Sequence, residues 1–442
     1  MEKKISPYIL ILISFISIIV VGASILTLSI SLKSGVKISF FEALFTATSA
    51  VTVTGLTLLD VSETFNGFGN VIILILIQLG GLGILTFSSL IVLLVSKKIG
   101  YYTKKIVKED LNFEDNFDIY LYIKKVAMVV FGIEILGAIF LLSDFLKKYS
   151  VGKAIFYSIF HSISAFCNAG FSLYSNNLEG FVDNVYVNII IAFLIFTGGV
   201  GFAAIIDIYE YIQGRGRRLT INTKFSLYIT VSLLFIGMFL FLIFEYTNNN
   251  SIGDLPFLKK ILASFFQSVS LRTAGFNTVN LNELRLPTVL VSCILMFIGA
   301  SSGSTGGGIK TNTVGIIFLG IKASMKNREE IVFSKRKISF KTFNKAVALL
   351  FVALSYLFII FLLMSIFEND KNMVKVLFEL ISAMGTVGLS MGITASLTIY
   401  SKILLIITMF LGRVGLLTVI LALSRSTEKG KYVYPEGNIL IG

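Results

Sequence analysis

The stretch FEALFTATSAVTVTGL, residues 41–56, is apolar and ends with a glycine that lies ten positions after Phe45. The same pattern occurs four times along the chain, as the pairs Phe45/Gly55, Phe160/Gly170, Phe265/Gly275 and Phe378/Gly388. The glycines are 115, 105 and 113 residues apart, and Leu or Phe follows each of them directly. Self-similarity at a nearly constant period indicates repeated structural units, so the sequence predicts a fourfold internal repeat.

Composition places the chain among membrane proteins. Of its 442 residues, 55% are hydrophobic and 14% are charged, a balance outside the range of soluble proteins. Each short segment lies between longer hydrophobic stretches that are long enough to span a membrane, since a helix needs roughly 20 apolar residues to cross a bilayer. These stretches are residues 8–31, 69–96, 126–143, 186–206, 226–244, 289–321 with an interruption, 346–366 and 402–423. Because all four prolines lie outside the uninterrupted stretches, each of those is expected to be a continuous helix.

The short segments are expected to enter and leave the membrane on the same side, as re-entrant half-helices. They cover residues 41–56, 154–171, 261–276 and 374–389. Two crossings per unit then give all four units one orientation around a shared axis. The predicted fold class is an all-α integral membrane protein, with four tandem helix–pore loop–helix repeats around a central pseudo-fourfold pore. The predicted repeats 1 to 4 are residues 1–100, 101–222, 223–325 and 326–442, and the last includes a C-terminal tail.

The net charge of +13 is unevenly distributed. The links after each second helix and the N-terminus hold 24 of the 38 Lys and Arg residues, whereas the opposite loops hold 11. The positive-inside rule therefore predicts that both termini are cytoplasmic. We interpret the basic face as a determinant of topology that meets anionic lipid headgroups, rather than as a nucleic-acid site. Cys167 and Cys293 offer no disulfide or metal framework, and His161 is expected to be a packing residue.

The four segments around the repeated glycines are the candidate ion-binding residues. A dehydrated alkali cation needs oxygens in place of water, and four strands can supply rings of backbone carbonyls without a full charge. Glycine permits the conformations that turn carbonyls toward an axis. The alternative, glycine turns between packed helices, does not explain four copies in register. The predicted filter segments are Thr52, Val53, Thr54 and Gly55; Cys167, Asn168, Ala169 and Gly170; Arg272, Thr273, Ala274 and Gly275; and Gly385, Thr386, Val387 and Gly388.

A glycine motif recurs in the second helices, as Gly80-Gly81-Leu82-Gly83, Gly198-Gly199-Val200-Gly201 and Gly412-Arg413-Val414-Gly415. In repeat 3, Gly299 holds the matching place and opens a polar, glycine-rich break. Glycine costs about 1 kcal/mol per helical position, and non-helical backbone at membrane depth must be buried or line a cavity. We interpret the break as a gate below the filter. Its predicted residues are Gly299, Ser301, Ser302, Gly303, Ser304, Thr305, Gly306, Gly307, Gly308 and Lys310, together with Arg413.

The break has two other interpretations. It could be a simple kink for helix packing, and that alternative stays open. A phosphate-binding loop is rejected, because the stretch has one residue more than GxxxxGK[ST], lacks a preceding strand and lies in a membrane segment.

Charged residues at membrane depth cost roughly 2.5–3.5 kcal/mol each and usually have a function or a partner. Arg413 is expected either to raise a barrier to cations and contact the gate, or to form a structural ion pair with Glu379. Arg272 is expected to brace its segment from behind rather than to face ions. Glu42, Glu134 and Glu379 are expected to be structural acceptors.

These repeats and single filter glycines resemble the superfamily of Trk, Ktr and HKT potassium transporters over essentially the whole chain. The resemblance is strongest to the KtrB type, the membrane subunits of Ktr uptake systems. A Trk-type subunit is the alternative, although such subunits usually carry an additional N-terminal helix pair. The resemblance implies filter glycines at Gly55, Gly170, Gly275 and Gly388, a gating loop in repeat 3 and an arginine at the position of Arg413. It also implies that the tail, Tyr432 to Gly442, lies at a dimer contact.

The resemblance further implies potassium uptake across the bacterial cytoplasmic membrane, with K⁺ as the cargo and Na⁺ as a candidate activator. A homodimer would sit on a cytosolic ring of nucleotide-binding regulatory subunits of the KtrA type. This chain has no GxGxxG and no complete Walker motif, so no nucleotide is expected on it. A Na⁺- or H⁺-coupled symporter is the alternative mechanism. A membrane enzyme is disfavoured, because the sequence has no catalytic dyad, metal cluster or phosphorylatable Asp motif.

Overall fold

The computed structural model describes residues 7–83, 119–214, 218–328, 330–416 and 418–419. Several predictions fall outside these ranges. They concern the later parts of the stretches 69–96 and 402–423, the basic residues at 3–4, 97–118 and 425–431, and the tail from Tyr432 to Gly442.

The helices follow one order four times: a first helix, a shorter helix of 12 to 16 residues, and a second helix. These sets are α1 (Pro7–Leu26), α2 (Phe40–Val51) and α4 (Gly67–Leu82); α7 (Ile119–Phe145), α8 (Val151–Phe166) and α9 (Val185–Val200); α11 (Ile221–Glu245), α12 (Phe257–Ser270) and α13 (Leu286–Phe297); and α15 (Phe340–Phe367), α16 (Met373–Gly385) and α17 (Ile399–Val414). The remaining elements are α3 (Val61–Thr64), α10 (Phe202–Ile212), α14 (Thr311–Met325), the hairpin of β1 (Ile331–Phe333) and β2 (Arg336–Ile338), and four 3₁₀ turns at Ser29–Ser31, Glu179–Phe181, Leu281–Glu283 and Thr394–Ser396.

Three helices in the described residues, α7, α11 and α15, are long and apolar enough to cross a membrane. Their outer faces carry large exposed apolar side chains, among them Phe235, Phe239 and Phe358, which are 56%, 60% and 63% exposed. A soluble protein would bury such rings, whereas lipid tails accommodate them. The membrane class predicted from composition therefore agrees with the helical fold.

The second helices are not continuous, contrary to the prediction for residues 186–206. The chain breaks at Gly201, and the axes of α9 and α10 differ by 103°. The helices α4 and α17 likewise end just before Gly83 and Gly415. These three glycines have φ of 102°, 80° and 90°, a left-handed conformation that cannot continue a right-handed helix. Repeat 3 is interrupted as expected, between α13 and α14.

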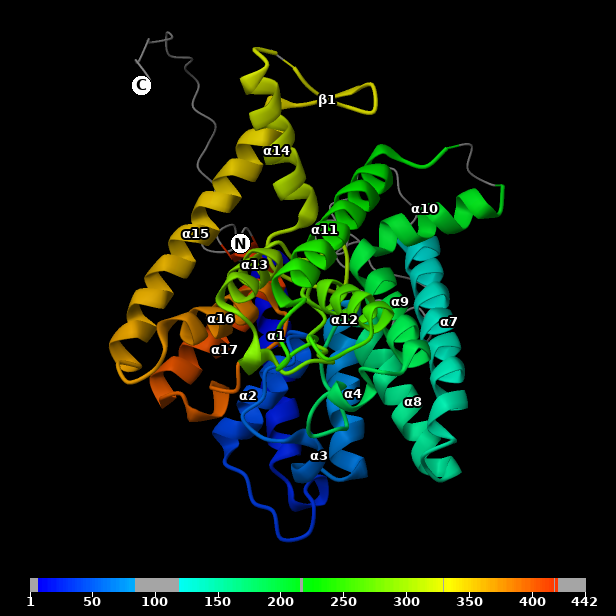
Figure 1. Ribbon diagram of the computed structural model, residues 1–442, viewed down its shortest axis with the longest axis vertical. Helices are drawn as coiled ribbons and strands as arrows, with labels where there is room; N and C mark the ends of the chain where they lie inside the picture. The colour runs from blue at the N-terminus through cyan, green and yellow to red at the C-terminus, as the bar shows by residue number, and fades with distance from the viewer. Residues whose placement is uncertain (1–6, 84–118, 215–217, 329, 417, 420–442) are drawn as a thin grey trace, which may run out of the picture.

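The two ends of the molecule differ in what they carry (Figure 1). Helices α10 and α14 and the hairpin lie at one end, and α3 and the turn between α7 and α8 lie at the other. In between, each short helix packs against a neighbour in its own set: α1 on α2, α7 on α8, α11 on α12, and α16 on α17. The short helices thereby point their C-terminal ends into the interior.

A fully buried phenylalanine anchors each short helix, and in three repeats it is the phenylalanine ten positions before the glycine. Phe45, Phe160 and Phe378 are 0% exposed, as is Phe266, whereas Phe265 is only half-buried. Phe265 lies ten positions before Gly275 only because it is next to Phe266, the phenylalanine that is buried. Repeat 3 has one residue fewer between its buried phenylalanine and its glycine than the other three repeats.

Candidate functional site

The four repeated glycines form a closed ring. A Cβ on Gly55 would lie 2.6 Å from the carbonyl oxygen that precedes Gly170, and one on Gly170 would lie 3.0 Å from the carbonyl before Gly275. In the same way, a Cβ on Gly275 would meet the carbonyl before Gly388, and a Cβ on Gly388 would meet the carbonyl before Gly55, which closes the ring. The contacted carbonyls belong, in ring order, to Ala169, Ala274, Val387 and Thr54. Segments about a hundred residues apart are therefore brought to one point.

The backbone of the ring repeats as well. All four glycines have positive φ: 96° at Gly55, 68° at Gly170, 75° at Gly275 and 89° at Gly388. The residue two positions earlier is also left-handed in each segment. These residues are Val53, Asn168, Thr273 and Thr386, with φ of 55°, 58°, 71° and 49°. Non-glycine residues pay of order 1–3 kcal/mol for this conformation, and such strain persists where the surroundings enforce it.

Serines hold the segments from behind, four positions after each buried phenylalanine. In repeats 1 and 4 the serine hydroxyl accepts the N–H of the ring glycine, at 2.9 Å for Gly55 and 3.0 Å for Gly388. In repeats 2 and 3 the hydroxyl donates instead to the carbonyl of Phe171, at 2.7 Å, and of Phe276. These serines were not predicted from the sequence, although the Phe-x-x-x-Ser spacing was a visible signal. They are Ser49, Ser164, Ser270 and Ser382.

The recurring glycine motif of the second helices has a steric cause. Gly80, Gly198 and Gly412 stand directly against carbonyl oxygens near the C-terminal ends of α2, α8 and α16. A Cβ at any of the three would overlap the oxygen, which belongs to Val51, Phe166 or Met384 respectively. Only glycine allows the second helices to approach the short helices this closely.

The predicted gating loop, residues 299–310, runs between α13 and α14 and joins several repeats. The N–H groups of Ser301 and Thr305 donate to the carbonyls of Gly199 and Gly198, at 3.0 and 3.2 Å. At its other end, Gly308 donates to Gly412 at 3.2 Å. The loop therefore reaches from the second helix of repeat 2 to that of repeat 4.

The loop also lies against the predicted filter segments. The N–H of Gly307 donates to the hydroxyl of Thr386 at 2.9 Å, and Gly306 stands against the hydroxyl of Thr273 with no space for a side chain. Within the loop, Ser304 donates to Ser301, and Lys310 donates to the carbonyl of Gly306, both at 2.6 Å. Ser302 and Gly303 are exposed. The predicted gate and filter residues are thus neighbours in space.

Arg413 connects the gating loop to repeat 1. Its guanidinium donates to the carbonyl of Thr305 in the loop, and to the carbonyls of Gly80 and Gly81 at the end of α4. The carboxylate of Glu379, the other predicted partner, accepts hydrogen bonds from Ser390 and Thr394. A planar guanidinium suits this role, because its fork can meet several carbonyls at once.

The other charged residues singled out from the sequence have hydrogen-bond partners within the protein. Arg272 donates to the carbonyls of Thr230 in α11 and Gly299, at 2.9 and 3.3 Å, so its side chain lies behind its segment. Glu42 forms a capping box with Ser39. Glu134 accepts the side-chain N–H groups of Gln78 at 3.0 and 3.1 Å.

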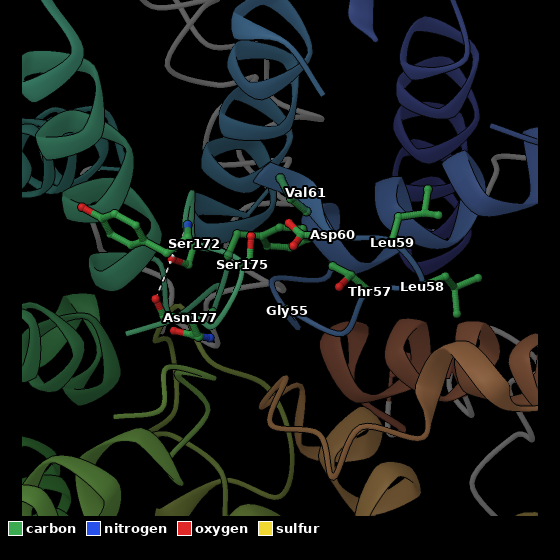
Figure 2. A pocket seen from close by; sticks show the side chains of 12 residues that line it. Gly55, Thr57, Leu58, Leu59, Asp60, Val61, Ser172, Ser175 and Asn177 are labelled. Carbon is green, nitrogen blue, oxygen red and sulfur yellow. Dashed lines mark hydrogen bonds between the residues drawn. The ribbon is translucent and has the colours of Figure 1, made fainter. Parts of the chain in front are cut away.

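Two adjoining cavities, of about 220 and 310 Å³, open at the ring on the side away from the gating loop. They share Gly55, Thr57 and Asn177, and Asn177 donates to the carbonyl of Gly275 at 3.1 Å. Figure 2 shows the smaller one, with Asp60 and Ser175 next to each other at its rim. The pair of cavities also reaches Gly170 and Gly388, so three of the four ring glycines line this mouth, and Asn177 connects it to the fourth.

Asp60 is the acidic residue of the smaller cavity. Its Oδ1 accepts the N–H and hydroxyl of Ser62, at 2.8 and 2.7 Å, and the N–H of Glu63 at 3.3 Å. Partial burial alone would raise the pKa of Asp60, but the hydrogen bonds from Ser62, Ser175 and Glu63 outweigh it and lower the pKa. A negative charge therefore stands at the mouth at neutral pH.

The model of the TrkH family, described as a cation transport protein, matches residues 5–434. The chain belongs to the TrkH family. Relatives in this family include the Ktr system potassium uptake protein B of Bacillus subtilis, 39% identical over 434 residues that cover 97% of this chain and 95% of the relative. The potassium/sodium uptake protein NtpJ of Enterococcus hirae is 37% identical over 449 residues, covering 100% and 98%. The family resemblance predicted from the sequence is confirmed.

The fold of the TrkH family also accounts for the architecture. The crystal structure of the potassium transporter TrkH from Vibrio parahaemolyticus matches with a TM-score of 0.74, covering 96% of this chain and 86% of that one. Sequence identity in that comparison is 17%, so it bears on the fold alone. The family and these relatives are transporters, which agrees with the prediction that the chain is not an enzyme.

Proposed function

We propose that this chain takes up potassium ions across the bacterial cytoplasmic membrane, through a pore on the axis of the glycine ring. The single observation that carries the proposal is the closed ring, in which each glycine stands against the carbonyl before the next. Uncharged oxygens arranged around an axis can replace the water of a dehydrated cation. The names of relatives that cover nearly the whole chain support potassium as the cargo.

In this proposal the four sets of helices are quarter-units of the pore, with the predicted boundaries near residues 100, 222 and 325. The four predicted segments form the selectivity filter, and the cavities beside Asp60 form its outer mouth. Both termini and the hairpin of β1 and β2 would face the cytoplasm. The basic residues around this hairpin, such as Lys335, Arg336 and Lys337, support that orientation.

The gating loop would close the pore below the filter. Two observations support this role: the loop lies against Thr273 and Thr386, and its hydrogen bonds tie it to the second helices of repeats 2 and 4. Arg413 would hold the closed position through Thr305 and would place a positive charge on the ion path. Opening then requires the contacts of the loop with these helices to break.

We further propose that the protein works as a homodimer on a cytosolic ring of nucleotide-binding subunits. The support is the name of the relatives, which are proteins of a Ktr system and therefore imply other components. Nucleotide control would come from that partner. A Na⁺-dependent mechanism is the second candidate, with Na⁺ as an activator or a coupled ion, because one relative is named a potassium/sodium uptake protein.

The test is ion flux in liposomes that contain the purified full-length protein. We expect K⁺ to enter down its gradient, faster than Na⁺ and independently of a Na⁺ or proton gradient. Uptake that requires an opposing or accompanying gradient would favour the symporter. The absence of K⁺ flux, in liposomes and in bacteria that lack their own uptake systems, would overturn the proposal.

A further inference from the structure

An outer set of polar contacts lies behind the predicted filter, beyond the serines. The residue directly after each buried phenylalanine is polar and 0% exposed. Eleven positions later, on the strand that leaves the ring, each repeat has a hydroxyl side chain. The four pairs are Thr46 with Thr57, His161 with Ser172, Gln267 with Thr278, and Glu379 with Ser390. The spacing holds in repeat 3 only when Phe266 replaces Phe265 as the anchor.

In repeat 2 the contact is made by His161. Its Nδ1 lies 2.8 Å from the carbonyl of Tyr157, which can only accept, so Nδ1 carries the proton and Nε2 is an acceptor. Nε2 lies 3.2 Å from the hydroxyl of Ser172 and accepts the N–H of Leu173 at 3.4 Å. The ring also stacks on Tyr174, with centroids 5.0 Å apart. The exit strand is therefore held at a hydroxyl and at the next backbone amide.

In repeat 4 a carboxylate makes the same pair of contacts. Oε1 of Glu379 accepts the hydroxyl of Ser390 at 2.5 Å and the N–H of Met391 at 3.0 Å. Oε2 accepts the hydroxyl of Thr394 at 2.8 Å. The imidazole of His161 and the carboxylate of Glu379 thus make hydrogen bonds to equivalent groups, a hydroxyl eleven positions later and a backbone N–H twelve positions later.

The other two repeats do not make this contact in the described part of the chain. The side-chain amide of Gln267 and the hydroxyl of Thr278 are both buried without a hydrogen bond. The hydroxyl of Thr46 donates to the backbone carbonyl of Glu42 within its own helix, at 2.9 Å. Because the ring runs through repeats 1, 2, 3 and 4 in order, the two repeats that make the contact lie opposite each other.

We propose that His161 and Glu379 are positioning residues that hold the exit strands of two opposite filter segments and so set ion selectivity. The inference rests on the proposed function, since selectivity presupposes a conducting ring. Ion-coordinating groups must be held within about 0.5 Å of their productive places by the groups behind them. Hydrogen bonds buried in a low dielectric resist displacement more than exposed ones do.

The experiment measures the ratio of Na⁺ to K⁺ flux in liposomes, for full-length protein that elutes as a single folded species. For Glu379→Ala we expect the ratio to rise about tenfold, since three hydrogen bonds to the buried carboxyl group are lost. Glu379→Gln keeps an oxygen for Ser390 and Met391 and is expected to stay within about twofold of the unaltered protein. His161→Ala is expected to act in the same direction as Glu379→Ala.

Gln267→Leu is the matched control, because Gln267 is equally buried and holds the equivalent position without a hydrogen bond. We expect its flux ratio to be unchanged. Ser390→Ala removes the hydroxyl that donates to Glu379. Because Ser390 is only half-buried, this variant keeps the test decisive if Glu379→Ala fails to fold.

A normal flux ratio in both Glu379→Ala and Ser390→Ala, in protein that conducts K⁺, would overturn the positioning role. So would a Gln267→Leu ratio shifted as far as that of Glu379→Ala, because any change behind the filter would then suffice. Failure of the unaltered protein to conduct K⁺ would instead overturn the proposed function, so the two failures are distinguishable.

Discussion

Gly55 meets two constraints that no other residue satisfies together. Its φ is 96°, and a Cβ would lie 2.6 Å from the carbonyl oxygen of Ala169. Gly55→Ala must therefore strain the backbone and push this carbonyl away. We expect K⁺ flux per folded protein to fall about tenfold or more. Gly152→Ala is the control, because nothing lies within 4 Å of the Cβ it would add. Flux within twofold of normal for Gly55→Ala would contradict a conducting role for the ring.

Arg413 holds three carbonyls, in the gating loop and at the end of α4. In Arg413→Ala the loop loses this attachment and the proposed ion path loses a positive charge. We expect higher, leakier conduction without any regulatory partner, measured as K⁺ efflux from loaded liposomes. Arg413→Lys keeps the charge but lacks the fork, so an intermediate leak is expected. Unaltered flux with normal expression would return Arg413 to a purely structural role.

Asp60 supplies the negative charge of the mouth. In Asp60→Asn we expect the K⁺ concentration for half-maximal uptake to rise about threefold at low ionic strength, and the difference to shrink as salt screens it. Lys33→Gln, at an exposed residue that does not line the smaller cavity, is the control. Equal half-maximal concentrations at low salt would remove Asp60 from the ion path.

The lowered pKa of Asp60 also predicts the sign of a pH effect. A carboxyl with a folded pKa below its ordinary value of 3.8 stabilises the fold above that value and loses this contribution as the pH falls through its folded pKa. Thermal unfolding at decreasing pH should therefore show an acid loss of stability that is smaller in Asp60→Asn.

The gating loop yields a prediction for a whole segment. Residues 303–308 include the groups that contact Phe202, Thr386 and Gly412. Their deletion should remove the obstruction below the ring and raise K⁺ flux in the absence of a partner. Light-scattering and expression measurements would establish that the deleted protein is folded. Unchanged flux would argue that the break is the packing kink that the sequence left open.

The sequence predicted the short helices well, because their apolar segments and terminal glycines recur at a regular period. It did not show which phenylalanine of repeat 3 is buried, since Phe265 and Phe266 are neighbours and only the folded packing buries Phe266. It also missed the breaks at Gly83, Gly201 and Gly415. The sequence motif showed a recurring glycine there, but it did not show the sign of φ that the close approach of the helices imposes.

The candidate site was predictable to a different extent. The glycines of the ring were found, because a residue with a unique backbone freedom repeats in register. The partners of Ser49, Ser164, Ser270 and Ser382 are mostly backbone atoms, whose positions depend on the folded chain. Arg413 allowed two interpretations, because a sequence does not tell whether a guanidinium at membrane depth meets carbonyls or a carboxylate.

The orientation of the whole molecule can be tested with two exposed residues at opposite ends. Lys335 lies in the hairpin and Asn249 in the link after α11, and the native Cys167 and Cys293 are buried. A membrane-impermeant thiol reagent should label Asn249→Cys in intact cells and Lys335→Cys only in inverted vesicles. The basic hairpin motivates this assignment. Labelling of both variants from one side would overturn the shared orientation of the repeats.

The attachment of Arg413 to Gly80 spans 333 positions of the chain, and the ring needs Gly388 beside Thr54 before it can close. During synthesis the first three quarters of the protein therefore emerge without their final neighbour. A nascent chain stopped before repeat 4 would expose carbonyls in the bilayer that the complete protein shields. Such unfinished chains should be preferred targets for membrane proteases, because repeat 4 is made after the other three and closes the ring.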